Sequence, residues 1–514
     1  MNELLGANTD TLDLMAESLG LDARRLQDIG TRAQQVVAEM QAVWDGPDLW
    51  HLIQQWEQEG LPQLASASTS LDTCASQLRA QSSAQSGASS CDGSSSGPVL
   101  MWLTPGAALG IPVPASPGGG SSAEPPILTP TAGSPPGHGS PGENARWWKS
   151  LSAREQRSYI KEHPEWIGNR DGVPFAARDQ ANRALLGVDR DRLVAQQGRL
   201  KARLSGSWFG GTFTNDDAAL AHVKDKLASL EAIEQTLARD GDRQLLVLDL
   251  SQERAQAAIA RGNVDSADNV AVFVPGMTQT VNDSMKDDDH AMDQLQHRAE
   301  LENKRANPAG SSTTATVTWI GYQAPQWGLD LLGENSVAED HAAQVGAAQL
   351  VPFLRGIGAA RDHDAHLSLL GHSYGSTTAG LALRQNTGVD DVVFFGSAGI
   401  GTNDVKDLSV PGSHVSYIEA RWDPVGDLGY FGIDPSHMEG IEHASARAST
   451  VVDPMTGEIR HFAEVTGHGS YLVDDSTSQY NLSVVVAGLP NRRVLDGGEG
   501  VGDVLSWPIP GTYS

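Results

Sequence analysis

One short motif in the chain could activate a hydroxyl group, Gly371-His372-Ser373-Tyr374-Gly375. It has the G-x-S-x-G form in which a serine stands on a sharp turn between a strand and a helix. The apolar run HLSLL precedes it and STTAGLALRQ follows it, which suits a strand and then a helix. The flanking glycines keep side chains out of the bend. The motif predicts Ser373 as the nucleophile of an acyl transfer, and the alternative is a glycine-rich turn that happens to contain a serine.

A nucleophilic serine needs a base, and the base needs an acid that orients it. Where the serine stands on such a turn, the order along the chain is serine, then Asp or Glu, then His. Asp423 comes just after the run HVSYIEAR, which reads as a strand, and is the predicted acid. Asp427 is the alternative acid, whereas Glu419 lies within the strand itself.

The predicted base is His468, in the segment TGHGSY directly after the run IRHFAEV. A loop after a strand allows the imidazole to reach both the serine and a substrate. His461 lies inside the preceding strand, and we interpret it as a packed or surface residue. His437 and His443 fall between acid and base and fit less well.

Two sources of backbone N–H groups could stabilise an oxyanion. Tyr374 opens the helix after the nucleophile, where N–H groups lack helical partners and the helix dipole is positive. The apolar run VFVPGMT supplies a second loop, in which the N–H of Met277 or Thr278 would donate. An ordinary turn explains the Pro-Gly pair equally well.

The elements that must position these residues alternate between strand and helix patterns. Strands are expected at 244–250, 270–274, 314–319, 365–370, 392–395, 415–419 and 459–465, and helices at 218–237, 252–261, after 282, at 338–355 and after 376. The middle strands are apolar throughout, as in a parallel sheet that is covered on both faces. The expected class is therefore α/β, with the α/β-hydrolase arrangement of a mostly parallel sheet flanked by helices.

The predicted organisation has four parts. Residues 1–81 show apolar residues at helical spacing around the turn Trp44-Asp45-Gly46-Pro47 and predict a helical hairpin. Residues 82–144 are rich in Ser, Gly and Pro and predict a disordered linker. Residues 145–243 predict a helical first part of the catalytic region, and 244–514 the catalytic domain itself. The apolar stripe of the hairpin predicts self-association or a helical partner.

Composition excludes some functions. The formal net charge of −28 over 514 residues argues against nucleic acid as a partner. No stretch is long and apolar enough for a membrane span, and the first 20 residues lack the pattern of a secretory signal. The chain is thus expected in the cytoplasm or exported without a classical signal. Cys74 and Cys91 are its only cysteines, and either a bridge or two separate thiols fits.

No motif requires a cofactor or a metal. The chain contains no Walker A loop and no H-E-x-x-H, and Gly498–Gly502 lacks the strand and helix that a nucleotide fingerprint needs. The run Asp287-Asp288-Asp289-His290 resembles a cation site, but we interpret it as the acidic first turn of a helix. The expected partner is a small-molecule or lipid acyl substrate.

Several segments together resemble an actinobacterial α/β-hydrolase family of unknown specific function. They include LLGHSYGSTTAG, VPGMTQT, WIGYQAP, EARWDPVGD and PEWIGNRDGVPFAARDQANRALL, over roughly 147–471. The resemblance implies an α/β-hydrolase fold and gives the serine, acid and base roles to Ser373, Asp423 and His468. It implies no particular substrate.

Residues 1–81 resemble the helical Trp-x-Gly proteins of type VII secretion, with Trp44-Asp45-Gly46 at the turn. The Tyr-x-x-x-Asp/Glu signal of those proteins has no counterpart, because 71–90 contains no tyrosine. The sequence thus predicts a serine hydrolase that acts on ester bonds, or on thioester or amide bonds, and carries this hairpin. The alternatives are a non-catalytic binding module and an exported effector that acts on a cell envelope.

Overall fold

The computed structural model describes residues 135–206 (138 excepted), 215–310, 312–326, 341–423 and 434–496, together with 425 and single residues between 23 and 79. Most of the predicted hairpin and linker lies outside these residues, as do Asp427 and Gly498–Gly502. The chain divides into one unit of residues 1–36 and 61–134 and a second of 37–60 and 135–514. All the predicted site residues belong to the second unit.

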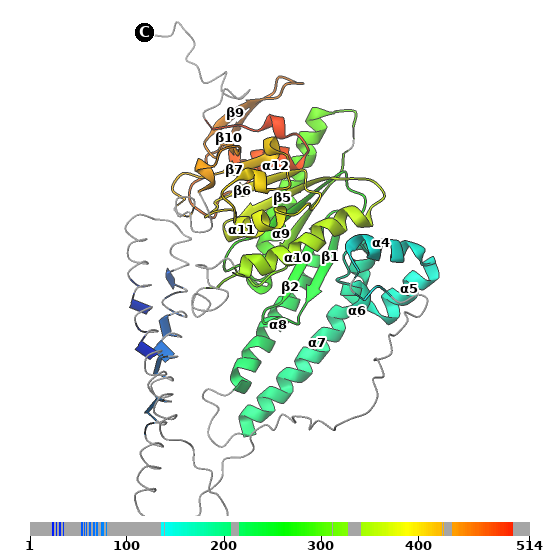
Figure 1. The fold of residues 1–514 in the computed structure, drawn as a ribbon, viewed down its shortest axis with the longest axis vertical. Helices are drawn as coiled ribbons and strands as arrows, with labels where there is room; N and C mark the ends of the chain where they lie inside the picture. Colours follow the sequence, from blue (N-terminus) through cyan, green and yellow to red (C-terminus); the bar gives the residue numbers. More distant parts are fainter. Residues whose placement is uncertain are drawn as a thin grey trace, which may run out of the picture. The chain divides into compact units, whose positions relative to one another are not determined.

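An eight-stranded sheet, as counted in the described residues, forms the centre of this unit (Figure 1). The strand order is β1-β2-β4-β3-β5-β6-β7-β8. The second strand, β2, is antiparallel to both of its neighbours, β1 and β4. The remaining six strands, in the order β4-β3-β5-β6-β7-β8, are parallel to one another. The strands are β1 (Arg243–Asp249), β2 (Gln256–Arg261), β3 (Asn269–Val274), β4 (Thr314–Ile320), β5 (His366–His372), β6 (Asp391–Phe395), β7 (Val415–Ile418) and β8 (Glu442–Ala444). A separate antiparallel pair is formed by β9 (Ser449–Val452) and β10 (Ile459–Phe462).

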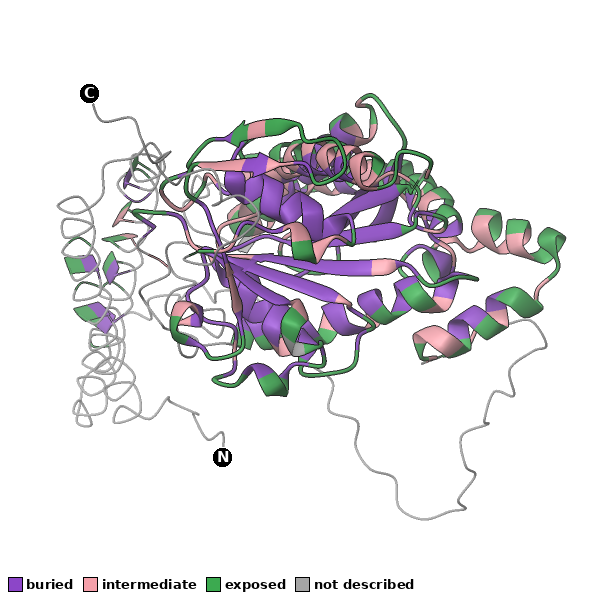
Figure 2. Cartoon of the chain, turned by 90° about the horizontal axis from the view of Figure 1, so that it is seen from above, coloured by how far each residue is buried: buried purple, intermediate pink, exposed green. Residues whose placement is uncertain are grey.

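Helices cover both faces of the sheet, so its strands are buried (Figure 2). Alternate residues of β3 join different clusters: Val270 and Val272 pack with α10 and α11, whereas Ala271 and Phe273 pack with α9 and α12. The helices are α4 (Pro141–Ser150), α5 (Ala153–Glu162), α6 (Pro164–Ile167), α7 (Phe175–Gly206), α8 (Asn215–Leu237), α9 (Val281–Ala306), α10 (His341–Ala360), α11 (Tyr374–Leu383) and α12 (Thr477–Val486). Among the described residues, no helix is both long and apolar enough to span a bilayer.

The helices before the sheet hydrogen-bond the outer edge of β1. The Asn169 side chain donates to Leu248 O at 2.7 Å and accepts from Leu248 N at 3.0 Å, as a neighbouring strand would. Asp179 accepts from Leu245 N at 2.7 Å. Side chains therefore satisfy an edge that would otherwise be free to pair with another chain.

The sheet with helices on both faces confirms the predicted α/β-hydrolase class. One predicted element is wrong: the helix at 252–261 is β2, a buried strand between β1 and β4. Its sequence QAAIAR favours helix by propensity, but its small side chains fit a strand buried on both faces. Three further elements, β8, β9 and α12, were not predicted from the sequence. Each residue of α12 is buried, so it lacks the amphipathic pattern by which helices are recognised.

Candidate active site

Ser373 lies on the turn between β5 and α11, as its motif predicts. Its backbone is in an unusual left-handed region, with φ 54° and ψ −128°. The bend brings the backbone close to neighbouring strands, because a Cβ on Gly375 would lie 2.1 Å from Val274 O and one on Gly371 would lie 2.8 Å from Ser376 Cα. Only glycine fits at these two positions, and the strained turn presents the hydroxyl at the carboxyl end of β5.

The predicted base and acid meet this hydroxyl. His468 Nε2 lies 2.8 Å from Ser373 Oγ, and His468 Nδ1 lies 3.0 Å from both carboxylate oxygens of Asp423. Asp423 follows β7, and His468 lies on the loop after β10. The two loops are joined where Gly467 N donates to Arg421 O at 2.9 Å. The structure thus brings together three side chains that lie as much as 95 positions apart.

The alternative histidines lie elsewhere. His461 contacts Thr450 Oγ1 at 2.9 Å on the β9–β10 pair, and His437 lies 3.9 Å from Asp434. His443, in β8, packs against Tyr417 of β7. None of these three has a contact with Ser373 or Asp423 among the described residues, so His468 is the histidine that this geometry favours.

Asp423 is buried, and this alone would raise the pKa of its carboxyl group. Hydrogen bonds from His468 and Tyr471, and from Val425 N at 2.9 Å, outweigh burial and hold the pKa below its ordinary value. Asp423 is therefore a carboxylate across the neutral range. It can hold the imidazole with its proton on Nδ1, which leaves the lone pair of Nε2 facing Ser373.

His372, the residue before Ser373, contacts the backbone of His468. Its ring is partly buried, and desolvation together with the nearby His468 lowers its pKa to about 3, so the ring stays neutral. Its Nε2 lies 3.0 Å from His468 O, which fixes the proton of this neutral ring on Nε2 as the donor. His372 thus ties the backbone of His468 to β5, the strand that leads to Ser373.

The loop after β3 passes beside Ser373. A Cβ on Gly276 would lie 2.7 Å from Ser373 Cβ, and the Tyr322 hydroxyl donates to Pro275 O at 2.8 Å. Thr278 is not the donor that the sequence analysis allowed, because its N–H already donates to Pro325 O at 2.9 Å. Met277 N–H in this loop and Tyr374 N–H at the start of α11 are the two predicted donors that we keep.

Two residues of the site were missed by sequence reasoning. The Tyr471 hydroxyl donates to Asp423 Oδ2 at 2.5 Å, although it lies only three residues after the predicted base. Gly396 follows β6 with φ 55°, and a Cβ there would lie 2.9 Å from Asp423 Oδ2 and 3.2 Å from His468 Nδ1. Three glycines in the run GSAGIG, at 396–401, are a sequence signal of an unusual backbone, but only the tertiary fold shows what Gly396 approaches.

Replacing Gly396 by alanine should therefore separate Asp423 from His468. The added methyl group cannot be accommodated without moving Asp423 or His468, and the φ of 55° costs about 1 kcal/mol for a residue with a Cβ. We expect kcat to fall about a hundredfold or more, as small misplacements do in active sites. Ester hydrolysis measures this, with Gly457→Ala as control, because Gly457 also has a positive φ but open space around it.

The acidic run of α9 does not form a cation site in the described part of the chain. No group of three or more His, Cys, Asp or Glu is placed there to hold a metal ion. The prediction that this run forms the first turn of a helix is wrong, because α9 begins at Val281. Asp289 instead pairs with the buried Arg243 at 2.9 Å, and burial raises the pKa of Asp288 to about 7.

Comparison with known proteins agrees with this architecture. Residues 251–433 match a family model described as alpha/beta hydrolase. The uncharacterized protein Rv0963c of Mycobacterium tuberculosis is 33% identical over 242 residues, which are 46% of this chain and 88% of that protein. The uncharacterized protein Rv2079 of the same organism is 30% identical over 342 residues, or 64% of this chain and 48% of that protein.

Among solved structures, an esterase of Pyrobaculum calidifontis aligns with 57% of this chain and 96% of its own, at 13% identity and a TM-score of 0.31. A cold-adapted esterase from an Arctic intertidal metagenomic library aligns with 50% of this chain and 96% of its own, at 12% identity and a TM-score of 0.30. By its family match and its mycobacterial relatives, the chain belongs to the α/β-hydrolase family.

Proposed function

We propose that this chain is a serine hydrolase that cleaves ester bonds through Ser373, His468 and Asp423. The observation that carries the proposal is the pair of contacts from one imidazole, 2.8 Å to Ser373 Oγ and 3.0 Å to Asp423. A serine, a base and an orienting acid in this geometry are the parts that acyl transfer needs. Esters are the expected substrates because they are easier to cleave than amides, and thioesters remain within the same chemistry.

In the proposed mechanism, Ser373 Oγ attacks the acyl carbonyl carbon while His468 Nε2 takes the hydroxyl proton. The N–H groups of Met277 and Tyr374 stabilise the oxyanion, and each such donor is worth about 3 kcal/mol. His468 then gives its proton to the leaving alkoxide, and an acyl-enzyme forms. A water molecule, deprotonated by His468, then attacks the ester carbonyl of the acyl-enzyme. The tetrahedral intermediate collapses, Ser373 Oγ takes the proton back from His468, and the carboxylic acid product is released.

Residues 1–81 complete the proposal as a helical hairpin for self-association or for a helical partner. Within the unit that contains them, the Ser68 hydroxyl donates to Ala23 O at 3.0 Å, and both residues are buried. This contact supports two segments side by side, as a hairpin requires. The natural acyl substrate is proposed only by class, as a small-molecule or lipid ester.

A fluorophosphonate probe tests the proposal, because it reacts with serines that a neighbouring base activates. We expect one covalent adduct on the full-length protein, located by mass spectrometry on Ser373 and lost in Ser373→Ala. Heat-denatured protein is the control for nonspecific reaction. A folded protein that stays unlabelled, or an adduct on another serine, would contradict the proposed nucleophile.

A further inference from the structure

We propose that Tyr471 is a positioning residue that holds the Asp423 carboxylate in place for the base. This inference rests on the proposed function and adds a fourth side chain to its machinery. Tyr471 lies on the loop of His468, so one short segment supplies both the base and a group that fixes the acid. Nothing in the G-x-S-x-G motif or in the order serine, acid, base points to a tyrosine here.

The direction of the hydrogen bond follows from counting protons. The Tyr471 oxygen accepts from Ala420 N at 2.9 Å, and a backbone N–H can only donate. The hydroxyl has one proton of its own, and its other neighbour is Asp423 Oδ2 at 2.5 Å. The proton must therefore lie between Tyr471 and Asp423. Because Ala420 precedes Asp423 by three residues, the tyrosine also fixes the backbone that leads to the acid.

The ring of Tyr471 has little freedom. Only 1% of the residue is exposed, and its ring centroid lies 5.5 Å from that of Phe395 and 5.8 Å from that of His372. Gly396 lies against the ring, since a Cβ there would be 2.9 Å from Tyr471 Cε2. The hydroxyl is thus set by packing against β6 and β5, the strands next to the nucleophile, and does not depend on solvent.

The carboxylate of Asp423 is held from three sides. Oδ1 accepts from Val425 N, Oδ2 accepts from Tyr471, and both oxygens lie 3.0 Å from His468 Nδ1. Without the tyrosine, Oδ2 would keep only its share of the bond to the imidazole. A buried carboxylate with an unfilled acceptor position is free to turn, and the imidazole turns with it.

The substitution Tyr471→Phe tests this role, because it removes the hydroxyl and keeps the ring. We expect kcat/KM for p-nitrophenyl butyrate to fall about 10- to 100-fold, as for a lost hydrogen bond to a charged group. The hydrogen bond from Tyr471 also helps to keep the pKa of Asp423 low, so its loss would raise that pKa. The acid limb of the kcat/KM profile should therefore move to higher pH.

Tyr480→Phe is the matched control. Tyr480 is also buried and also donates its hydroxyl proton, here to Arg492 O at 3.1 Å, but it has no contact with Asp423 among the described residues. The control should lose a similar amount of stability while its pH profile stays that of the parent. If Tyr471→Phe and Tyr480→Phe changed kcat/KM equally and neither moved the acid limb, Tyr471 would be merely structural.

A double-mutant cycle separates this inference from the proposed function. In an Asp423→Asn background, Tyr471→Phe should change kcat/KM less than about threefold, because Tyr471 acts through the missing carboxylate. Full additivity of the two losses would overturn the inference while leaving the hydrolase intact. Failure of the proposed function would look different, since Ser373→Ala would then retain the activity of the parent.

Discussion

Replacing His468 by alanine should reduce kcat/KM for an activated ester by about 10⁴-fold or more. Among the described residues, the imidazole of His468 is the group in contact with Ser373 Oγ, at 2.8 Å. No other side chain in the described part of the chain is placed to take the hydroxyl proton. His372 is close but cannot replace it, because its Nε2 faces His468 O and its pKa is lowered to about 3. Steady-state hydrolysis of p-nitrophenyl butyrate measures the effect.

His461→Ala is the control for this prediction. His461 belongs to the strand that leads to the same loop, contacts Thr450 and is exposed, so its loss should leave kcat/KM within about twofold of the parent. The reverse result, with an active His468→Ala and an inactive His461→Ala, would show that His468 is not the base. Circular dichroism of both variants shows that the comparison concerns folded protein.

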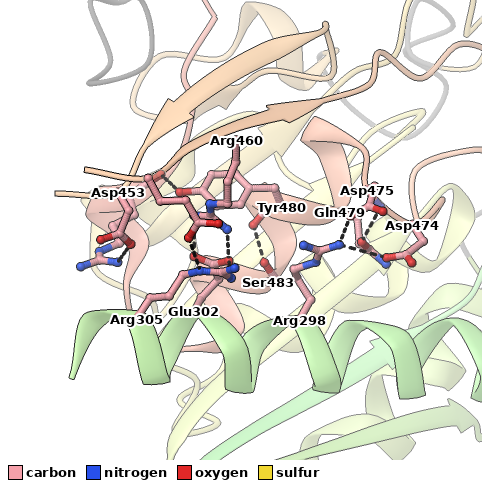
Figure 3. A network of polar contacts seen from close by, with 12 residues as sticks. Arg298, Glu302, Arg305, Asp453, Arg460, Asp474, Asp475, Gln479, Tyr480 and Ser483 are labelled. Carbon is pink, nitrogen blue, oxygen red and sulfur yellow. Dashed lines mark hydrogen bonds and ion pairs between the residues drawn. The ribbon is translucent and has the colours of Figure 1, made fainter. Parts of the chain in front are cut away.

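Replacing Glu302 by glutamine should lower the free energy of unfolding of the larger unit by about 3 kcal/mol, within the range for buried ion pairs that lose one partner. Glu302 is fully buried on α9 and receives two hydrogen bonds from Arg460 of β10 and one from Arg305 at 3.0 Å (Figure 3). The Arg460 guanidinium also lies 5.4 Å from the ring centroids of Phe462 and Tyr480. Glutamine keeps the shape but removes the carboxylate that pairs with Arg460 in a poorly solvated place, while Arg305 keeps its contact with Glu458.

Glu458→Gln provides the comparison, because Glu458 contacts the same Arg305 at 3.5 Å but is half exposed. A surface pair of this kind contributes at most about 1 kcal/mol to the free energy of unfolding. The urea midpoint of Glu458→Gln should therefore stay close to that of the parent. Equal midpoints for the two variants would mean that the buried pair does not anchor β10. Because the chain continues from β10 to His468, Glu302→Gln should also lower activity at temperatures well below the unfolding transition.

The sequence predicted the parts of this protein that depend on local pattern. A strand, a G-x-S-x-G turn and a helix can be recognised in about 20 residues, because the turn needs glycine at fixed offsets from Ser373. Covered parallel strands such as β3 and β5 are apolar throughout, so they stand out without knowledge of their neighbours. The order serine, acid, base along the chain then leaves a few candidates for the acid and the base, and Asp423 and His468 were the predicted ones.

Local pattern failed where packing decides the outcome. The segment QAAIAR has the propensity of a helix, yet it is β2 because both neighbouring strands supply backbone partners that a local reading cannot see. Thr278 looked as good a donor as Met277 until Pro325, on a distant segment, was found to accept its N–H.

The sequence by itself determined the fold class, the turn of Ser373 and the order of the residues predicted to act with it, since periodicity and glycine placement are local properties of the chain. Only the tertiary structure decided how closely those residues approach, that Tyr471 and Gly396 lie against Asp423, and that His372 ties His468 to β5. Such contacts join segments up to 96 residues apart, and they arise from the order in which parallel strands pair in the sheet, which no single segment encodes.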